Sequence, residues 1–158
     1  MSNGKSRKEA NEKATQESKV AISRKHFGGE SPIVISEITD NCLYTGFFGV
    51  MDSARITSIT QKILDLLAAS ETEIVIVDLS NVDMVDSSVA LHLSKVVATL
   101  KLVGATVIFC GISPTVAQIM VTAGVELGTT PICRDLKAAL SRVFALQGFK
   151  LVPIETGN

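Results

Sequence analysis

EIVIVDLSNVDMVDSSVALHL, residues 73–93, carries the pattern that decides the fold class. Its four consecutive apolar residues, Ile74 to Val77, are typical of a β-strand that is covered on both faces. From Ser88 onward, apolar residues recur at steps of three and four, as they do on the buried face of an α-helix. A buried strand that passes directly into a helix is one half of a β-α-β unit, so the stretch predicts an α/β fold.

The same alternation of short apolar runs and helical patterns extends in both directions from this stretch. Strands are expected at residues 32–38, 42–49, 73–80, 105–111 and 129–133. Helices are expected at residues 51–70, 88–104, 113–124 and 134–146. The turn sequence TDN should join the first two strands into a hairpin, whereas strands separated by helices should lie parallel with right-handed crossovers. The sequence thus predicts an α/β fold, a mixed β-sheet of about five strands with about four helices packed beside it.

Each expected helix has one apolar face. The residues expected to point into the core are Ile56, Ile59, Ile63, Leu66, Leu67, Val89, Leu93, Val96, Leu100, Val103, Leu136, Leu140 and Val143. Asp52 or Ser53 is a suitable N-cap for the first helix, and Gly104 is expected to end the second. Phe47 and Phe48 are neighbours in a strand, so one of them should face outward, and the sequence does not decide which.

The charge of the chain is distributed unevenly. Residues 1–30 contain seven Lys or Arg and four Glu residues, a net charge of +3, whereas the remaining 128 residues carry −4. The N-terminal part also lacks apolar periodicity, so we expect a flexible polar arm at 1–31, one domain at 32–148 and a C-terminal tail at 149–158. A mildly acidic domain lacks the basic face that nucleic-acid binding requires, so no nucleic-acid partner is expected.

Metal, cofactor and membrane sites are not indicated by the sequence. Cys42, Cys110 and Cys133 lie far apart without a CxxC pair, and their odd number argues against a disulfide framework. No run approaches the roughly 20 apolar residues of a membrane span, and the N-terminus has no apolar signal-peptide core. These features predict a soluble cytoplasmic protein with free thiols and with no metal, no cofactor and no membrane partner.

Asp86, Ser87 and Ser88 lie where the expected strand passes into the helix. Asp and Ser are ordinary N-caps, so a purely structural role is the simpler interpretation. The carboxyl edge of such a sheet is also where open α/β folds bind ligands, so another protein could reach a serine there. Asp78, Asp83 and Asp86 are expected to gather negative charge at this edge. A phosphate of about −2 added among them would repel its neighbours and alter any docking surface.

No set of residues in the sequence suggests catalysis. His92 lies within a helical pattern with no carboxylate or cysteine at ligand spacing, and the GxSxG, Walker A and GxGxxG motifs are absent. Phosphoryl-aspartate chemistry would need an acidic pair on an earlier strand and a lysine near VIFCG, residues 107–111. The sequence meets neither requirement, so a non-enzymatic protein is expected.

Two segments, IVIVDLSNVDMVDSSVALHL and LKLVGATVIFCGISPTVAQIMVTAG, resemble the STAS domain of anti-sigma factor antagonists, and within that family the stressosome proteins of the RsbR and RsbS type. The likeness extends over about residues 32–146 and implies a single STAS domain. It also implies that Ser87 is phosphorylated by a separate GHKL-type serine/threonine kinase. From their place at the charged edge of the sheet, Asp83, Asp86 and Ser88 are expected to form the partner-docking edge. Other STAS-domain stressosome proteins are implied as partners, in a homo- or hetero-oligomer.

Three functions are compatible with this resemblance. The first is a phospho-regulated stressosome scaffold that sequesters the kinase until Ser87 is phosphorylated. The second is a free antagonist that binds an anti-sigma factor directly, and the third is a module that binds a nucleotide or a lipid. The chain departs from the RsbR type at Ser113, where many members have arginine, and at Ile119, where they have a second phosphorylatable threonine. Thr115 and Thr122 lie nearby without matching that position.

Overall fold

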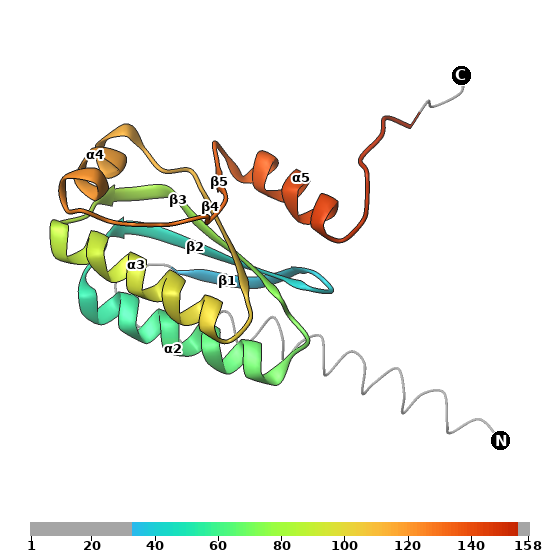
Figure 1. Ribbon diagram of the computed structural model, residues 1–158, viewed down its shortest axis with the longest axis horizontal. Helices are drawn as coiled ribbons and strands as arrows, with labels where there is room; N and C mark the ends of the chain where they lie inside the picture. Colours follow the sequence, from blue (N-terminus) through green and yellow to red (C-terminus); the bar gives the residue numbers. More distant parts are fainter. Residues whose placement is uncertain (1–32, 155–158) are drawn as a thin grey trace.

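Residues 33–154 are described by the structure, a computed structural model, and the arm expected at 1–31 lies outside the described residues. The described chain forms one five-stranded sheet in the order β1-β2-β3-β4-β5 (Figure 1). Its strands are β1 (Val34–Thr39), β2 (Cys42–Val50), β3 (Ile74–Met84), β4 (Thr106–Cys110) and β5 (Ile132–Cys133). Its helices are α2 (Ser53–Ala69), α3 (Ser87–Leu102), α4 (Pro114–Thr122) and α5 (Leu136–Leu146). The succession of elements predicted from the sequence is therefore confirmed.

The pairing of the strands follows from how they are connected. A tight turn at residues 40 and 41 joins β1 to β2, and these two strands pair antiparallel. β3, β4 and β5 are each reached through a helix, and each pairs parallel with the strand before it. A connection that contains a helix returns the chain to the same end of the sheet, which explains the mixed sheet.

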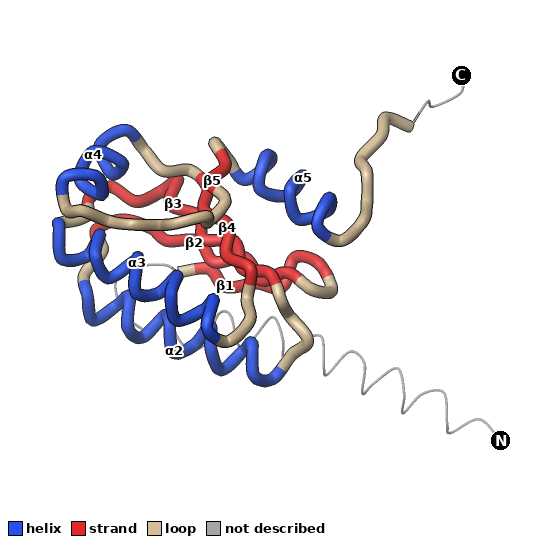
Figure 2. Tube along the Cα trace, in the orientation of Figure 1, coloured by secondary structure: helices blue, strands red, loops and turns tan. Residues whose placement is uncertain are grey.

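The helices cover the two faces of the sheet unequally. α2, α3 and α4 pack on one face, and α5 packs alone on the other (Figure 2). The larger core, under α2 and α3, includes Leu43, Phe47, Ile56, Ile63, Val75, Val77, Val89, Leu93 and Phe109. The smaller core, under α5, contains Cys42, Ile74, Ile76, Ile108, Cys110, Ala139 and Val143. β3 supplies residues to both cores because successive side chains of a strand point to opposite faces.

The helix faces predicted from the apolar spacing are buried with one exception. Leu66, Leu67, Leu136 and Leu140 are partly buried against the cores, and the other expected inward residues except Val103 are buried. The prediction for Val103 is wrong, since its side chain is 58% exposed. α3 ends one residue earlier, and the chain turns away at Gly104, whose φ of 91° suits glycine. Phe47 is the buried member of the aromatic pair, and Phe48 is half-buried.

β3 is longer than the sequence pattern predicts, and this extension positions the candidate site. The strand was expected to end at residue 80, but it continues to Met84. Its last residues pair with the end of β2, where Gly49 lies opposite Val82 and Val50 lies opposite Met84. β4 ends at Cys110, which pairs with Asp78, so the ends of β2 and β3 extend beyond it. The start of α3 is consequently carried to an open edge of the molecule (Figure 1).

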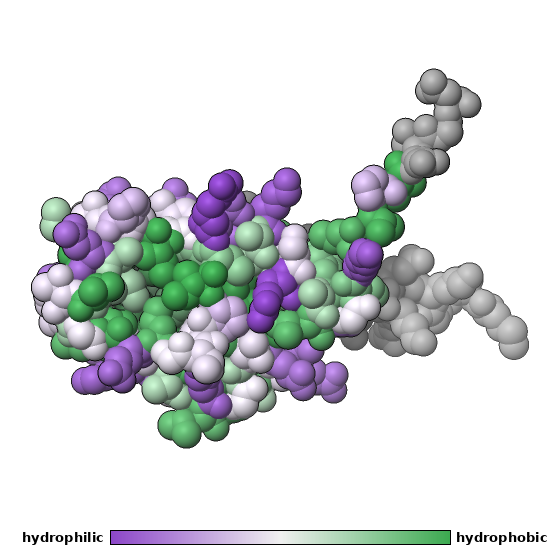
Figure 3. All heavy atoms as spheres, turned by 45° about the horizontal axis from the view of Figure 1, so that its top comes forward, coloured by the Kyte–Doolittle hydropathy of each residue, from purple (hydrophilic) through white to green (hydrophobic). Residues whose placement is uncertain are grey.

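The C-terminal part of the described chain leaves the sheet after α5. Residues 149–154 have no regular structure, and their side chains project from the body (Figure 3). The ring of Phe149 contacts Phe144 edge to face, with ring centroids 6.4 Å apart, but it stays exposed, as do Leu151, Val152 and Ile154. Among residues 33–154, no helix has the length and apolar character needed to cross a membrane.

Candidate functional site

Asp86 caps helix α3 at the carboxyl edge of the sheet. Its backbone is extended, and its Oδ1 accepts a hydrogen bond from the N–H of Val89 at 2.8 Å. This bond, together with one from the Ser88 side chain, lowers the pKa of the Asp86 carboxyl below its usual value. The sequence offered both Asp86 and Ser87 as caps, and our hypothesis that Ser87 caps the helix as well as accepting a phosphate is wrong in its first part. The helix begins at Ser87, and an N-cap lies one residue before the first helical residue.

Ser87 is the exposed hydroxyl at the first position of α3. Within the described part of the chain its Oγ has no hydrogen-bond partner, and the N–H of Val89 is bound to Asp86 instead. A hydroxyl that is exposed and unpaired loses no intramolecular contact when it is modified. Ser87 is therefore the more available of the two adjacent serines.

Ser88, in contrast, faces helix α2. Its Oγ lies 3.5 Å from the Oγ of Ser53, the first residue of α2. One turn further along the two helices, Thr57 Oγ1 lies 3.2 Å from His92 Nε2. These two contacts hold the N-terminal ends of α2 and α3 side by side. They also give His92 a hydroxyl as its partner.

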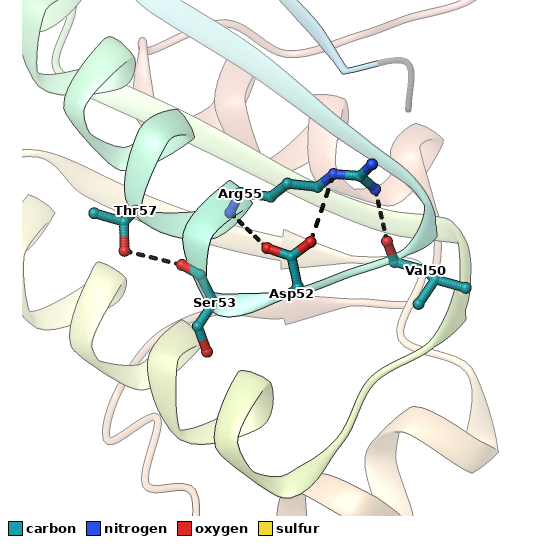
Figure 4. A network of polar contacts seen from close by, with 5 residues as sticks. All are labelled: Val50, Asp52, Ser53, Arg55 and Thr57. Atoms are coloured by element: carbon teal, nitrogen blue, oxygen red, sulfur yellow. Dashed lines mark hydrogen bonds and ion pairs between the residues drawn. The ribbon is translucent and has the colours of Figure 1, made fainter. Parts of the chain in front are cut away.

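A second helix start, that of α2, lies at the same edge and carries a polar network (Figure 4). Of the two caps considered from the sequence, Asp52 is the one observed, since its Oδ1 accepts from the N–H of Arg55 at 2.8 Å. The Arg55 guanidinium reaches back to donate to the carbonyl of Val50 at 2.9 Å and lies 3.8 Å from Asp52 Oδ2. Arg55 thus brings a positive charge to an edge that also carries the exposed carboxylates of Asp83 and Asp86.

Exposed apolar side chains surround the two serines. Val50 and Met84 are paired across β2 and β3, and they are 59% and 63% exposed. Leu91 is also exposed, and it lies on α3 one turn after Ser87 and Ser88. The partner-docking edge expected at Asp83, Asp86 and Ser88 stays a prediction. We refer to the neighbouring residues Val50, Met84, Ser87, Ser88 and Leu91 as the docking surface because they are where we expect a partner to bind. Its apolar members carry no distinguishing signal in the sequence, and at Val50 a register shift after Gly49 interrupts the strand alternation.

The expected clustering of three aspartates at this edge is only partly correct. Asp83 and Asp86 are exposed there, but Asp78 is 5% exposed and lies within the sheet. Its carboxylate accepts hydrogen bonds from the Tyr44 hydroxyl at 2.9 Å, from the Ser80 N–H at 2.9 Å and from the Ser80 hydroxyl at 2.6 Å. Burial, and then the neighbouring Asp78, raise the pKa of Tyr44. Asp78 therefore fixes β3 to β2 instead of adding charge to the docking surface.

One serine near α4 has a structural role. Ser113 caps α4, and its Oγ accepts from the N–H of Val116 at 3.2 Å. Thr115 and Thr122 are exposed at the two ends of this helix, and neither is part of the docking surface. No group of three or more histidine, cysteine or acidic residues within residues 33–154 is arranged to hold a metal ion.

The comparisons with known proteins agree with this geometry. The profile of the STAS domain family matches residues 34–139. The RsbT co-antagonist protein RsbRD of Bacillus subtilis (strain 168) is 30% identical over 117 residues, which cover 74% of this chain and 41% of that protein. The chain therefore spans less than half the length of this relative.

Two solved structures have the same arrangement of strands and helices. An RsbS variant from Moorella thermoacetica has a TM-score of 0.63 at 19% identity, over 77% of this chain and 100% of that chain. A chain in a structure of the stressosome, which is described as a signal integration and transduction hub, has a TM-score of 0.59 at 19% identity. The latter likeness covers 73% of this chain and 99% of that chain. At these identities the likenesses establish the fold.

Proposed function

The chain is a member of the STAS domain family, and from this we propose that it is a phospho-regulated, non-enzymatic protein-interaction domain of a bacterial stress-signalling partner switch. In this role it sequesters a GHKL-type serine/threonine kinase within a cytoplasmic stressosome until Ser87 is phosphorylated. By analogy with RsbRD, which is named as a co-antagonist of RsbT, the kinase is of the RsbT type. Other STAS-domain proteins, or further copies of this chain, complete the assembly.

One observation carries this proposal: at the start of a helix, an exposed serine hydroxyl that has no hydrogen-bond partner among residues 33–154 lies near exposed apolar side chains. Val50, Met84 and Leu91 supply apolar area that a partner can bury, and removing apolar surface from water favours association. Ser87 lies among these side chains, so a phosphate attached to it would change the surface that the partner covers.

The same position allows the phosphate to act on binding without disturbing the fold. A phosphate on Ser87 would lie at the N-terminus of α3, where the helix dipole and the unpaired backbone N–H groups favour negative charge. It would also bring a charge of about −2 next to the exposed carboxylates of Asp83 and Asp86. Burying this group of charges against an apolar or acidic partner is unfavourable, so the kinase is released.

Phosphopeptide mapping tests the assignment. The full chain is incubated with the purified RsbT-type kinase of the same genome and Mg-ATP, and the labelled peptides are sequenced. We expect one label on Ser87, none on Ser87→Ala, and normal labelling of the matched variant Ser88→Ala. Label on Ser88 or Thr115 with Ser87 unmodified contradicts the assignment. The absence of any label also contradicts the assignment.

Binding and mass measurements test the scaffold role separately. We expect the unmodified chain to bind the kinase and Ser87→Asp to bind it at least tenfold more weakly, while both proteins unfold at similar temperatures. We also expect light scattering to give a particle far larger than a dimer, for the chain alone or mixed with RsbR-type proteins. A monomer under both conditions favours the free antagonist of an anti-sigma factor over a scaffold.

A further inference from the structure

A group of three cysteines lies on the face of the sheet that α5 covers. All three cysteines are free, and all three belong to the small core under α5. Cys42 and Cys110 are buried, whereas Cys133 is half-exposed at the edge of the sheet. The proposed function uses none of them.

Cys110 and Cys133 are brought together by the pairing of the last two strands. They are Cα partners in the parallel pair of β4 and β5. Neighbouring strands are about 4.8 Å apart, and the Cα atoms of disulfide-bonded cysteines are separated by about 4.4–6.8 Å. Side chains at paired positions point to the same face, and both sulfur-bearing side chains pack in the core under α5. The distance and the direction therefore permit a bond between these two residues.

Cys42 does not share this arrangement. Its partner on β3 is Ile74, whereas the β3 partner of Cys110 is Asp78, four residues further along the strand. Four residues of strand correspond to about 13 Å, and β3 lies between β2 and β4. Cys42 is therefore too far from Cys110 for a bridge, and it provides a control within the same core.

We infer that Cys110 and Cys133 form a peroxide-sensitive dithiol that closes reversibly to an intramolecular disulfide. Cys133 reacts first, because it is half-exposed on a two-residue edge strand. Its thiolate attacks the peroxide oxygen, the O–O bond breaks, and a sulfenic acid and an alcohol or water result. The Cys110 sulfur then attacks the Cys133 sulfur, the S–OH bond breaks, and the Cys110 proton leaves with the hydroxide as water. Overall, two thiols lose two electrons and two protons to one peroxide.

The environment of Cys110 explains why it is not the first of the two thiols to react. Burial, followed by the charge of Asp78, raises the pKa of the Cys110 thiol to about 12. A thiol with a high pKa stays protonated and resists direct oxidation by peroxide, which reacts with thiolates. Cys110 is thus protected until its neighbour Cys133 has been converted to a sulfenic acid.

The resulting bond is expected to be readily reduced. The strand spacing of about 4.8 Å exceeds the mean Cβ separation of about 3.8 Å in relaxed disulfides, so β5 has to move toward β4. β5 has only two residues. Just before it, the carbonyl of Pro131 accepts a hydrogen bond from the N–H of Phe109 on β4 at 2.9 Å. Strained disulfides have higher reduction potentials than structural ones, which is typical of regulatory bonds. Closure would also draw the start of α5 toward β4.

Thiol counting on the full chain tests the inference. The protein is treated with hydrogen peroxide, unfolded in guanidinium, alkylated and weighed intact. We expect the number of alkylated cysteines to fall from three to one, a peptide map to link Cys110 to Cys133, and dithiothreitol to restore three. The matched control Cys42→Ser should fall from two to zero. In Cys133→Ser, whose changed residue is half-exposed and so tolerates the substitution, both thiols should stay alkylated.

A trapping experiment orders the two steps. In Cys110→Ala, peroxide followed by dimedone should give one adduct, on Cys133. Three alkylated cysteines in the oxidised wild-type protein overturn the inference. So does a bond that includes Cys42, or a disulfide-linked dimer on a non-reducing gel. A dimedone adduct on Cys42 but not on Cys133 overturns the proposed order of reaction. These readouts do not depend on the kinase, so they are independent of the function proposed for Ser87.

Discussion

Replacing Ser87 with alanine separates the two roles that a serine at a helix start can have. Ser87 is exposed, and its hydroxyl has no hydrogen-bond partner within the described residues. The N–H of Val89 is already bound to Asp86 Oδ1 at 2.8 Å. The substitution therefore removes no intramolecular hydrogen bond, and alanine is more favourable in a helix than serine. We expect the free energy of unfolding to change by less than about 0.5 kcal/mol.

Ser113→Ala is the matched control, because Ser113 is a serine that does cap a helix. Its Oγ accepts a hydrogen bond from Val116 at 3.2 Å, and loss of a serine N-cap costs about 0.5–2 kcal/mol. Urea unfolding followed by circular dichroism measures both changes from the midpoints, provided that the slopes are equal. If Ser87→Ala destabilises the protein by about 1 kcal/mol or more, as Ser113→Ala is expected to do, then Asp86 is not the cap.

Three further substitutions test the polar contacts that hold the sheet and α3. Asp86→Ala should lower the unfolding temperature, and its difference from wild type should shrink below about pH 4, because a carboxyl with a lowered pKa stabilises the fold only while ionised. Tyr44→Phe should cost about 1–2 kcal/mol in urea unfolding through its lost bond to Asp78. Because the pKa of Tyr44 is raised, wild-type stability should fall above about pH 10 more steeply than that of Tyr44→Phe. Gly111→Ala should cost more than about 2 kcal/mol or prevent folding, since φ is 68° and the added Cβ would lie 2.7 Å from the Ser80 backbone N.

The order of the elements could be predicted from the sequence because it depends on local periodicity. Four apolar residues at the start of β3 and the spacing of Val89, Leu93 and Val96 on α3 are visible without any partner. The same holds for the turn that makes the hairpin of β1 and β2. Burial of these faces dominates the stability of a small domain, so elements with a clear apolar pattern were found at nearly their observed positions.

The features that were missed depend on contacts between distant segments. The end of β3, from Asn81 to Met84, is short and only half of its residues are apolar, and it is ordered because β2 continues beside it. The sequence predicted Asp78 to be a carboxylate at the sheet edge. Its hydrogen-bond partner Tyr44 lies 34 residues earlier, on a neighbouring strand, and this contact is not visible in the local sequence. The prediction that Val103 is buried was wrong because the end of a helix is decided by capping, which the apolar spacing does not reveal.

Asp86 and Ser87 have separate roles at the start of α3, and this separation would suit Ser87 to reversible phosphorylation. Asp86 satisfies the backbone of α3, so the helix start does not depend on the Ser87 hydroxyl. Ser113 provides the contrast, since its hydroxyl is engaged at the start of α4 and a phosphate there would remove the cap. At Ser87 a phosphate would leave the cap in place and meet the favourable end of the helix dipole. The phosphate would instead weaken the binding of a protein that covers Val50, Met84 and Leu91. Phosphorylation would therefore change the affinity for a partner more than the stability of the fold.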